Sequence, residues 1–308
     1  MAETELLPSA IKLPSILDDL DSYHDAYDGG MLPVCDGDDI EYWVTDHFQR
    51  EVVDRLTQSF SGEHEMHVLG IGTGNGCKEL PMIDALGKCF KRVRVNVVEP
   101  AGIIREFQQL AASLRENRAD GNSLAFTWHQ ITLESYMKKS LLASQRHRFA
   151  FITALQSLYY VQDIDSTMDF LLDSLEEGGI LLIEINPASN QTEEFLIDKP
   201  WTQFPVIVTE SILKYLEGSS HVVKRFSLSS STLDVTSVFD VHSADGSKLL
   251  DILTEVSGFR NSASPDLLQS TLASLKSLAT RDEMGRYILH DPVDVLVVIK
   301  RPALSGAP

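Results

Sequence analysis

The sequence predicts an α/β fold built on a doubly wound parallel sheet, and two patterns carry this prediction. A short apolar run that ends at Ile71 enters a glycine-rich turn, where Gly72, Gly74 and Gly76 let the backbone turn sharply and approach a ligand closely. A second apolar run ends at Glu99, whose carboxylate is placed to accept hydrogen bonds from the two hydroxyls of a ribose. Together these features indicate the nucleoside-binding half of such a sheet.

The turn departs from the turns that bind polyphosphates. A dinucleotide fingerprint needs its third glycine at position 77, which is Cys77, and a P-loop needs Gly-Lys-Ser/Thr, whereas Cys77 separates Gly76 from Lys78. The predicted ligand therefore carries adenosine without a pyrophosphate, and S-adenosylmethionine fits this description. Taken alone, the turn is also compatible with a tight strand-to-helix connection that binds nothing.

Alternating strands and helices follow, in the order expected of a parallel sheet. Strands are predicted over residues 68–71, 93–98, 124–130, 148–155 and 179–185, with helices over 78–86, 103–114, 136–143 and 164–175. Before the turn, apolar residues from Asp39 to Phe60 recur at helical spacing and predict one or two amphipathic helices. After residue 186 the pattern loosens, and we expect helices over 186–199, 209–216, 246–258 and 264–278, one or two antiparallel strands over 222–241, and a last strand over 293–299.

These patterns suggest a division of the chain into consecutive parts. We expect an acidic, loosely ordered leader over residues 1–38, a helical cap that contributes to the substrate site over 39–66, a cofactor-binding core over 67–186, a substrate-binding lobe with the remaining sheet elements over 187–288, and the final strand and tail over 289–308.

Composition limits the partners and the location. The 308 residues include 45 acidic and 26 basic side chains, which gives a net charge of −19. This charge argues against nucleic acid or an anionic membrane as partner and favours a cationic small molecule. Such a charge is also explained by solubility alone. The three cysteines have no Cys-x-x-Cys spacing, so reduced thiols and no metal site are expected. No signal peptide or membrane span is apparent, and the expected location is cytoplasmic.

Five short segments narrow the prediction further. They are Gly72–Gly76, Val97–Pro100, Phe126–His129, Leu155–Val161 and Leu253–Glu255, and the similarity extends from about Asp39 to Ile299. With these segments the chain resembles the histamine N-methyltransferase family. The resemblance implies a Rossmann-like class I methyltransferase fold, with a mostly parallel seven-stranded sheet and a smaller substrate-binding lobe. It also implies S-adenosylmethionine as the methyl donor and a small imidazole amine as the acceptor.

The resemblance implies a set of residues for each ligand. The implied cofactor residues are Gly72, Gly74, Glu99, Ile104, Leu133 and Leu155, with Glu99 on the ribose and the two leucines on the adenine side. Family members have a glutamine shortly after the Glu-Pro pair, whereas this chain has Ile103 and Ile104 there, which puts that contact in doubt.

The implied substrate residues are Glu41, Gln156, Tyr159, Tyr160 and Asp291. Glu41 would bind the ammonium group through a charge-assisted hydrogen bond, and the Gln156 amide would fix the tautomer of the ring. The two tyrosines, together with Phe195 or Trp201, would offer π faces to a cation. Structural roles are also open. Glu41 fits a solvated carboxylate on a helix surface, and the two tyrosines fit core or boundary residues.

Asp291 replaces a family asparagine, with His290 as the neighbouring alternative, so the pocket is expected to be more anionic than in the family. No acid–base catalyst is implied, because an imidazole with a pKa of about 6.5 is largely neutral at pH 7. His129 is accordingly interpreted as a strand-end histidine rather than as a base.

Three functions follow, in order of preference. The first is an N-methyltransferase that acts on the imidazole nitrogen of histamine or a close relative. The second keeps the donor but takes carnosine, histidine or another amine as acceptor. The third is a non-catalytic ligand-binding protein with the same fold. A monomer is expected in each case.

Overall fold

The structure is a computed structural model that describes residues 12–31, 35–36, 39–117, 122–142, 147–197, 199–202, 204–228 and 231–301. It divides into two compact units, each made of three segments. The larger unit comprises Asp36–Asn190, Ile207–Thr232 and Asp291–Pro308, and the smaller one comprises Met1–Cys35, Gln191–Val206 and Leu233–His290. The expected lobe at 187–288 is therefore shared between them, because residues 207–232 belong to the larger unit.

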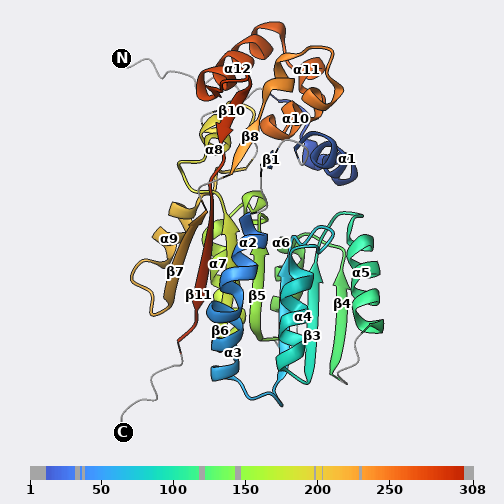
Figure 1. The fold of residues 1–308 in the computed structure, drawn as a ribbon, viewed down its shortest axis with the longest axis vertical. Coiled ribbons are helices and arrows are strands. Elements are labelled where there is room, and N and C mark those ends of the chain that lie inside the picture. The colour runs from blue at the N-terminus through green and yellow to red at the C-terminus, as the bar shows by residue number, and fades with distance from the viewer. Residues whose placement is uncertain are drawn as a thin grey trace. The chain divides into compact units, whose positions relative to one another are not determined.

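A seven-stranded sheet forms the centre of the larger unit, in the order β4-β3-β2-β5-β6-β11-β7 (Figure 1). The strands are β2 Glu65–Ile71, β3 Arg92–Val98, β4 Ser123–His129, β5 Phe149–Leu155, β6 Leu175–Ile185, β7 Val222–Leu228 and β11 Val293–Ile299. The first five pair in parallel, whereas β11 is antiparallel to both β6 and β7. The predicted mostly parallel seven-stranded sheet is confirmed.

Helices cover both faces of this sheet, as expected when parallel strands are buried on both sides. One face carries α2 Asp39–Trp43, η4 Val44–Val53, α3 Asp54–Ser59, α4 Glu79–Cys89 and α5 Ile104–Glu116, and the other carries α6 Leu133–Leu142, α7 Ile164–Ser174 and α9 Thr209–Leu216. Alternate strand residues enter the two apolar clusters: Val68 and Phe151 join the first, Leu69 and Ile152 the second. The periodicity found between Asp39 and Phe60 belongs to α2, η4 and α3, which follow one another directly.

The position of β2 locates the ligand crevice. It lies between β3 and β5, so the strand order reverses there. In open α/β sheets, ligands bind outside the carboxyl ends of the strands at such a reversal. The carboxyl ends of β2, β3, β5 and β6 are therefore where site residues are expected.

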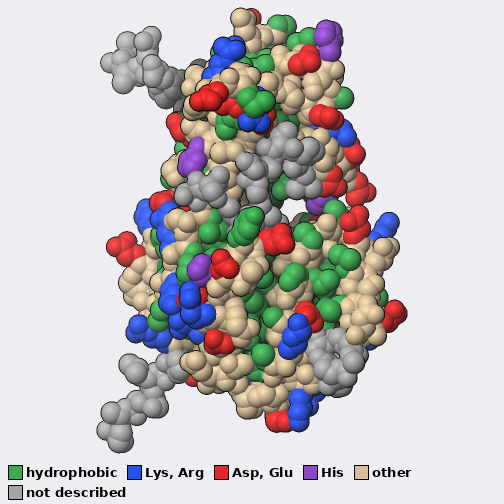
Figure 2. Space-filling model, viewed as in Figure 1, with side chains coloured by type: hydrophobic (Ala, Val, Ile, Leu, Met, Phe, Trp, Pro, Cys, Tyr) green, Lys and Arg blue, Asp and Glu red, His purple; other side chains and the backbone are tan. Residues whose placement is uncertain are grey.

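Basic side chains gather over β7 on the face of the larger unit seen in Figure 2. Lys224 of β7, at 2.6 Å, and Arg50 and Arg55 of the helical segment all pair with the buried carboxylate of Glu51. Burial acts to raise the pKa of Glu51, but the hydrogen bonds from Lys224 and Arg50 and the surrounding charges outweigh it and hold the pKa at about 2. This ion-pair cluster joins η4 to the edge strand.

The smaller unit combines helices with a second, four-stranded sheet in the order β1-β8-β10-β9. Its elements are η1 Ile16–Asp18, α1 Leu20–Ala26, η2 Tyr27–Met31, β1 Cys35–Asp36, α8 Gln191–Leu196, β8 Thr232–Asp234, η6 Thr236–Phe239, α10 Ala244–Thr254, α11 Phe259–Ser262, α12 Pro265–Leu278, β9 Thr280–Arg281 and β10 Tyr287–His290, with β1 and β8 reaching across the boundary. They enclose an apolar cluster of their own that includes Leu249, Phe259 and Leu289.

Part of the expected leader differs from the prediction. Asp19 caps α1 by accepting from the Ser22 N–H, and Asp25 pairs with Lys248 of α10 at 2.8 Å. Residues 15–31 are therefore a folded part of the smaller unit, while residues 1–11, 32–34 and 37–38 lie outside the described residues.

The strands expected over 222–241 form at Val222–Leu228 and Thr232–Asp234, and only the end of that region differs. After β7 and the short β8, Asp234 accepts a 2.9 Å hydrogen bond from the Thr236 N–H, which begins the 3₁₀ turn η6. Strand β10 was not predicted, because its four residues are too few for alternation to be recognised.

Candidate active site

The glycine-rich turn follows β2 directly and depends on its glycines. Gly72, Gly74 and Gly76 have φ angles of +59°, +54° and +74°, a region that L-residues with side chains rarely adopt. A Cβ on Gly72 would lie only 2.4 Å from the Cβ of Ser157, whereas a Cβ on Gly74 would meet no atom within 4 Å. Packing therefore requires the glycine at 72, and the backbone at Gly74 faces open space that a ligand can fill.

Glu99 lies beside this open backbone and is held in one orientation. Its Oε2 accepts a hydrogen bond from the Gly74 N–H and its Oε1 accepts one from the Ala101 N–H, both at 2.8 Å. Each carboxylate oxygen can accept a second hydrogen bond. An open glycine backbone next to an oriented carboxylate fits the ribose of S-adenosylmethionine, so the residues present suit that donor.

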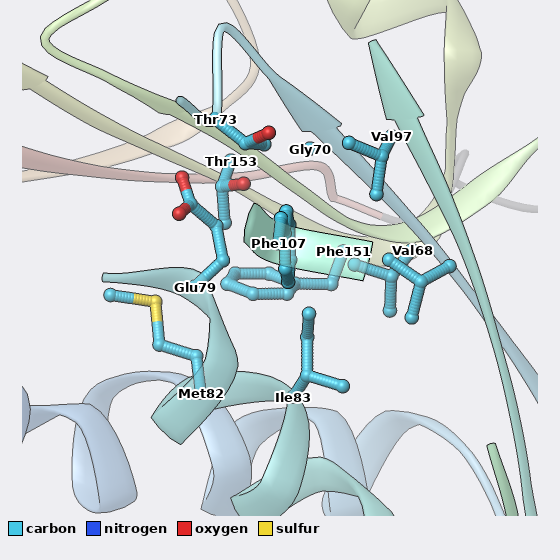
Figure 3. Close-up of a pocket in the computed structure, with 11 residues that line it drawn as sticks. Val68, Gly70, Thr73, Glu79, Met82, Ile83, Val97, Phe107, Phe151 and Thr153 are labelled. Carbon is cyan, nitrogen blue, oxygen red and sulfur yellow. The ribbon is translucent and has the colours of Figure 1, made fainter. Parts of the chain in front are cut away.

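A cavity of about 10 Å³ lies beneath the turn (Figure 3). Thr73, Thr153 and the carboxyl group of Glu79 gather at one end of it (Figure 3). Burial raises the pKa of Glu79 to about 8, so its carboxyl group is protonated at neutral pH. The hydroxyls of Thr73 and Thr153 are buried without a hydrogen-bond partner among the described residues. The cavity is the size of a single water and far too small for a nucleoside, so it lies under the ligand site rather than forming it.

Gln156, the first residue after β5, has a φ of +51°. Such a backbone is uncommon for a residue with a side chain, and it persists only where the surroundings impose it. Here the Gln156 N–H donates to the Glu184 carbonyl at 2.9 Å, which continues the pairing between β5 and β6. Ser157, which follows, contacts Gly72, so this segment adjoins the glycine turn.

The side chain of Gln156 belongs to a polar network. Its Oε1 accepts from the Tyr159 hydroxyl at 2.8 Å, and its Nε2 donates to Glu184 and to Asn186, at 3.4 Å each. The Tyr159 oxygen in turn accepts from the Asn186 N–H at 2.8 Å. The structure therefore brings together two of the predicted substrate residues, Gln156 and Tyr159, and the Tyr160 ring lies 6.2 Å from that of Tyr159.

Three residues of this network were not predicted: Lys78, Glu184 and Asn186. Lys78 Nζ lies 3.1 and 3.2 Å from the two carboxylate oxygens of Glu184, and Glu184 is only 3% exposed. A signal was present in the sequence, since Glu184 interrupts an otherwise apolar strand run at its carboxyl end. Its partner could not be found in that way, because Lys78 is 106 residues away.

Two predicted substrate residues lie elsewhere in the larger unit. Glu41 is an exposed residue of α2, and its carboxylate forms no ion pair or hydrogen bond within the described part of the chain. Asp291 accepts a 2.7 Å hydrogen bond from Asn190, whose amide also donates to the Pro292 carbonyl. Their contacts with the amine stay predictions.

The apolar residues assigned to the cofactor are core residues. Ile104, Leu133 and Leu155 are 1%, 8% and 4% exposed. Ile104 and Leu155 belong to the first apolar cluster and Leu133 to the second. Their contact with the adenine or the rest of the donor stays a prediction.

Two aromatic residues do not offer the expected open π faces. Phe195 is fully buried in the smaller unit and carries the Lys199 ammonium group 4.7 Å above its ring. Trp201 is 6% exposed and donates to the Thr254 carbonyl at 3.0 Å. Both are therefore core residues. The prediction differed because an aromatic residue in a sequence looks the same whether it lies in the core or lines a ligand site.

His129 lies at the end of β4, where its Nε2 is 3.3 Å from the Asn96 Oδ1. Burial, together with the charge of Lys139, lowers its pKa. These contacts agree with its interpretation as a strand-end histidine.

Two other features are absent from the described residues. They contain no group of three or more His, Cys, Asp or Glu side chains arranged to hold a metal ion. None of the helices in the described ranges is long and apolar enough to cross a membrane.

Known proteins resemble this chain over most of its length. The profile of the family described as "Methyltransferase domain" matches residues 45–223. Histamine N-methyltransferase of Xenopus tropicalis is 30% identical, over 75% of this chain and 80% of the relative. The enzyme of the same name from Danio rerio is 28% identical, over 83% and 89%. Carnosine N-methyltransferase 2 of Gallus gallus is also 28% identical, over 83% and 81%.

Proposed function

Because the chain belongs to the histamine N-methyltransferase family of S-adenosylmethionine-dependent enzymes, we propose that it methylates a ring nitrogen of histamine or a closely related small amine. The family membership confirms the predicted resemblance, the class I methyltransferase fold and S-adenosylmethionine as donor. The acceptor is the proposed part. The cytoplasmic location and the monomeric state stay predictions.

One contact carries the proposal. The Gln156–Ser157 segment touches the glycine turn at Gly72, so the residue proposed to hold the acceptor ring adjoins the residues proposed to hold the donor. In-line transfer requires this neighbourhood, because the accepting nitrogen has to be aligned with the methyl carbon.

Gly72, Gly74 and Glu99 would hold the donor at the carboxyl edge of β2 and β3. S-adenosylmethionine supplies a methyl group that is already activated on a sulfonium. The chain therefore needs to bind, orient and exclude water rather than provide a strong base. The Gln156 Oε1 accepts one hydrogen bond within the described residues, so its second acceptor position can take the N–H of an imidazole ring.

Charge supports a cationic acceptor. Glu41 and Asp291 are both carboxylates at positions that the family resemblance assigns to the substrate, and the chain carries a net charge of −19. A carboxylate at 291 disfavours an acceptor that bears its own carboxylate there. Carnosine remains the second candidate, since a carnosine N-methyltransferase is among the similar proteins.

A panel of acceptors tests the proposal. The protein is incubated with labelled donor and histamine, carnosine, histidine or a non-imidazole amine, and kcat/KM is determined for each. We expect the highest value for histamine. A higher value for carnosine would select the second candidate, and transfer to non-imidazole amines alone would contradict both.

A further inference from the structure

A buried ion pair lies at the carboxyl edge of the sheet and has no place in the function described so far. Glu184 is the second-to-last residue of β6, and Lys78 directly precedes α4. The carboxylate side chain is 4% exposed and the lysine side chain 28% exposed. Burying a carboxylate is costly even when it is paired, so such a pair is weak as a device for stability alone.

The pair ends a chain of hydrogen bonds with a fixed direction. A backbone N–H can only donate, so the Tyr159 oxygen accepts from Asn186 and its own proton is available to the Gln156 Oε1. A carboxylate can only accept, so the Gln156 Nε2 has to face Glu184. Tyr159 and Glu184 therefore favour the same orientation of the Gln156 amide. In this orientation the amide oxygen is the group that can accept a further hydrogen bond from a ligand.

We propose that Glu184, held by Lys78, is a positioning residue that fixes the orientation of the Gln156 amide and thereby keeps the attacking ring nitrogen of the acceptor free. This inference rests on the proposed function. With its oxygen oriented by Tyr159 and Glu184, Gln156 binds the protonated ring nitrogen and leaves the other nitrogen with a free lone pair. A flipped amide would donate to the unprotonated nitrogen and occupy the lone pair that has to attack the methyl carbon, so transfer would slow.

The transfer balances without a further reactant. The lone pair of the unprotonated nitrogen forms the new N–C bond, while the S–CH₃ bond breaks and its electron pair stays on sulfur as a neutral thioether. The methylated ring carries the positive charge and releases its N–H proton to solvent. Glu184 takes no part in these bond changes and acts only through Gln156.

The kcat for an imidazole acceptor, compared with the KM for the donor, tests this role. Glu184→Gln keeps the size of the side chain and an acceptor for Lys78, but it replaces an acceptor-only group with one that can also donate, so the amide of Gln156 can flip. We expect kcat to fall by roughly tenfold in Glu184→Gln, the scale of one hydrogen bond to a charged group. The KM for the donor should stay unchanged.

Glu51→Gln is the matched control. It removes the charge of another buried, lysine-paired carboxylate of the same unit, away from Gln156. We expect a lower melting temperature and an unchanged kcat. Tyr159→Phe is a second variant that frees the amide from the opposite end, and it should lower kcat in the same way even if Glu184→Gln does not fold.

Unfolding experiments decide the inference without turnover. In a double-mutant cycle of Glu184→Gln and Gln156→Ala, we expect the two substitutions to lower stability by less together than the sum of their separate effects. Additive effects would overturn the inference, as would a folded Glu184→Gln enzyme with the wild-type kcat. A wild-type protein that methylates no imidazole would instead overturn the proposed function, while the cycle would still report whether Glu184 holds Gln156.

Discussion

The proposed donor side and the proposed acceptor side of the site are built by different means. The donor side consists of backbone: a glycine turn with positive φ angles and amide N–H groups that orient Glu99. The acceptor side consists of side chains, with Gln156 held between Tyr159 and the Lys78–Glu184 pair. A turn built from backbone conformation leaves a local pattern in the sequence, whereas a side-chain network joins residues that are far apart in the chain. The difference explains why the glycine turn and Glu99 stand out in the sequence, whereas the Lys78–Glu184 pairing and Asn186 do not.

The largest expected effect comes from Gly72→Ala. The new Cβ would lie 2.4 Å from the Cβ of Ser157 and the residue would keep a strained φ, so the turn has to move. We expect a loss of more than about 2 kcal/mol in unfolding free energy and loss of measurable donor binding. Gly74→Ala is the control, because a Cβ there meets no atom. It should cost about 1 kcal/mol from backbone strain alone. Equal losses of unfolding free energy for the two variants in thermal unfolding would remove the packing argument.

Glu99→Ala is expected to weaken donor binding by about 1–3 kcal/mol, the range for hydrogen bonds to a charged group. Calorimetric titration with S-adenosylmethionine measures the change in Kd. The KM for the amine should change little, because Glu99 belongs to the donor side. An unchanged donor Kd would remove Glu99 from the ribose.

The third prediction concerns pH and the cavity beneath the turn. Burial raises the pKa of Glu79 from 4.5 to about 8 in the folded protein, so between these values the folded state binds a proton that the unfolded state has lost. The contribution of Glu79 to stability is therefore complete below about pH 4.5 and is lost as the pH rises to about 8, at up to about 1.4 kcal/mol per pH unit. Glu79→Gln should abolish this slope. Denaturant titrations of both proteins from pH 5 to 8 compare them, and parallel curves would contradict the assignment.

Glu41→Gln is expected to have the smallest effect. Its carboxylate is exposed, so we expect a several-fold rise in the KM for the amine, on the order of 1 kcal/mol, and no change for the donor. Steady-state kinetics with each substrate varied in turn separate the two. A comparable rise in both values would mean that Glu41 is a structural residue of α2.

What could be predicted from the sequence depends on how far apart in the chain the interacting residues lie. The sheet was predictable because apolar runs and the glycine turn are local, and Gln156 stands out in the sequence because it follows a buried strand. Lys78 stands out in the sequence only as the lysine that Cys77 separates from Gly76 in an incomplete P-loop motif. Nothing near it in the sequence indicates its pairing with Glu184. Phe195 and Trp201 were assigned to a ligand because the sequence does not reveal the apolar cluster that buries them. The folded segment at 15–31 was missed because its ion pair with Lys248 joins it to a helix that is distant in the sequence, although the Asp19 cap of α1 is local.

The contact between Gly72 and Ser157 has a consequence for redesign of the enzyme. Any larger residue at 157 would press on the glycine turn, which we propose holds the methyl donor, so broadening the range of acceptors from that position should also weaken binding of the donor. Directed evolution toward bulkier amines should therefore leave residue 157 small and find its useful changes elsewhere.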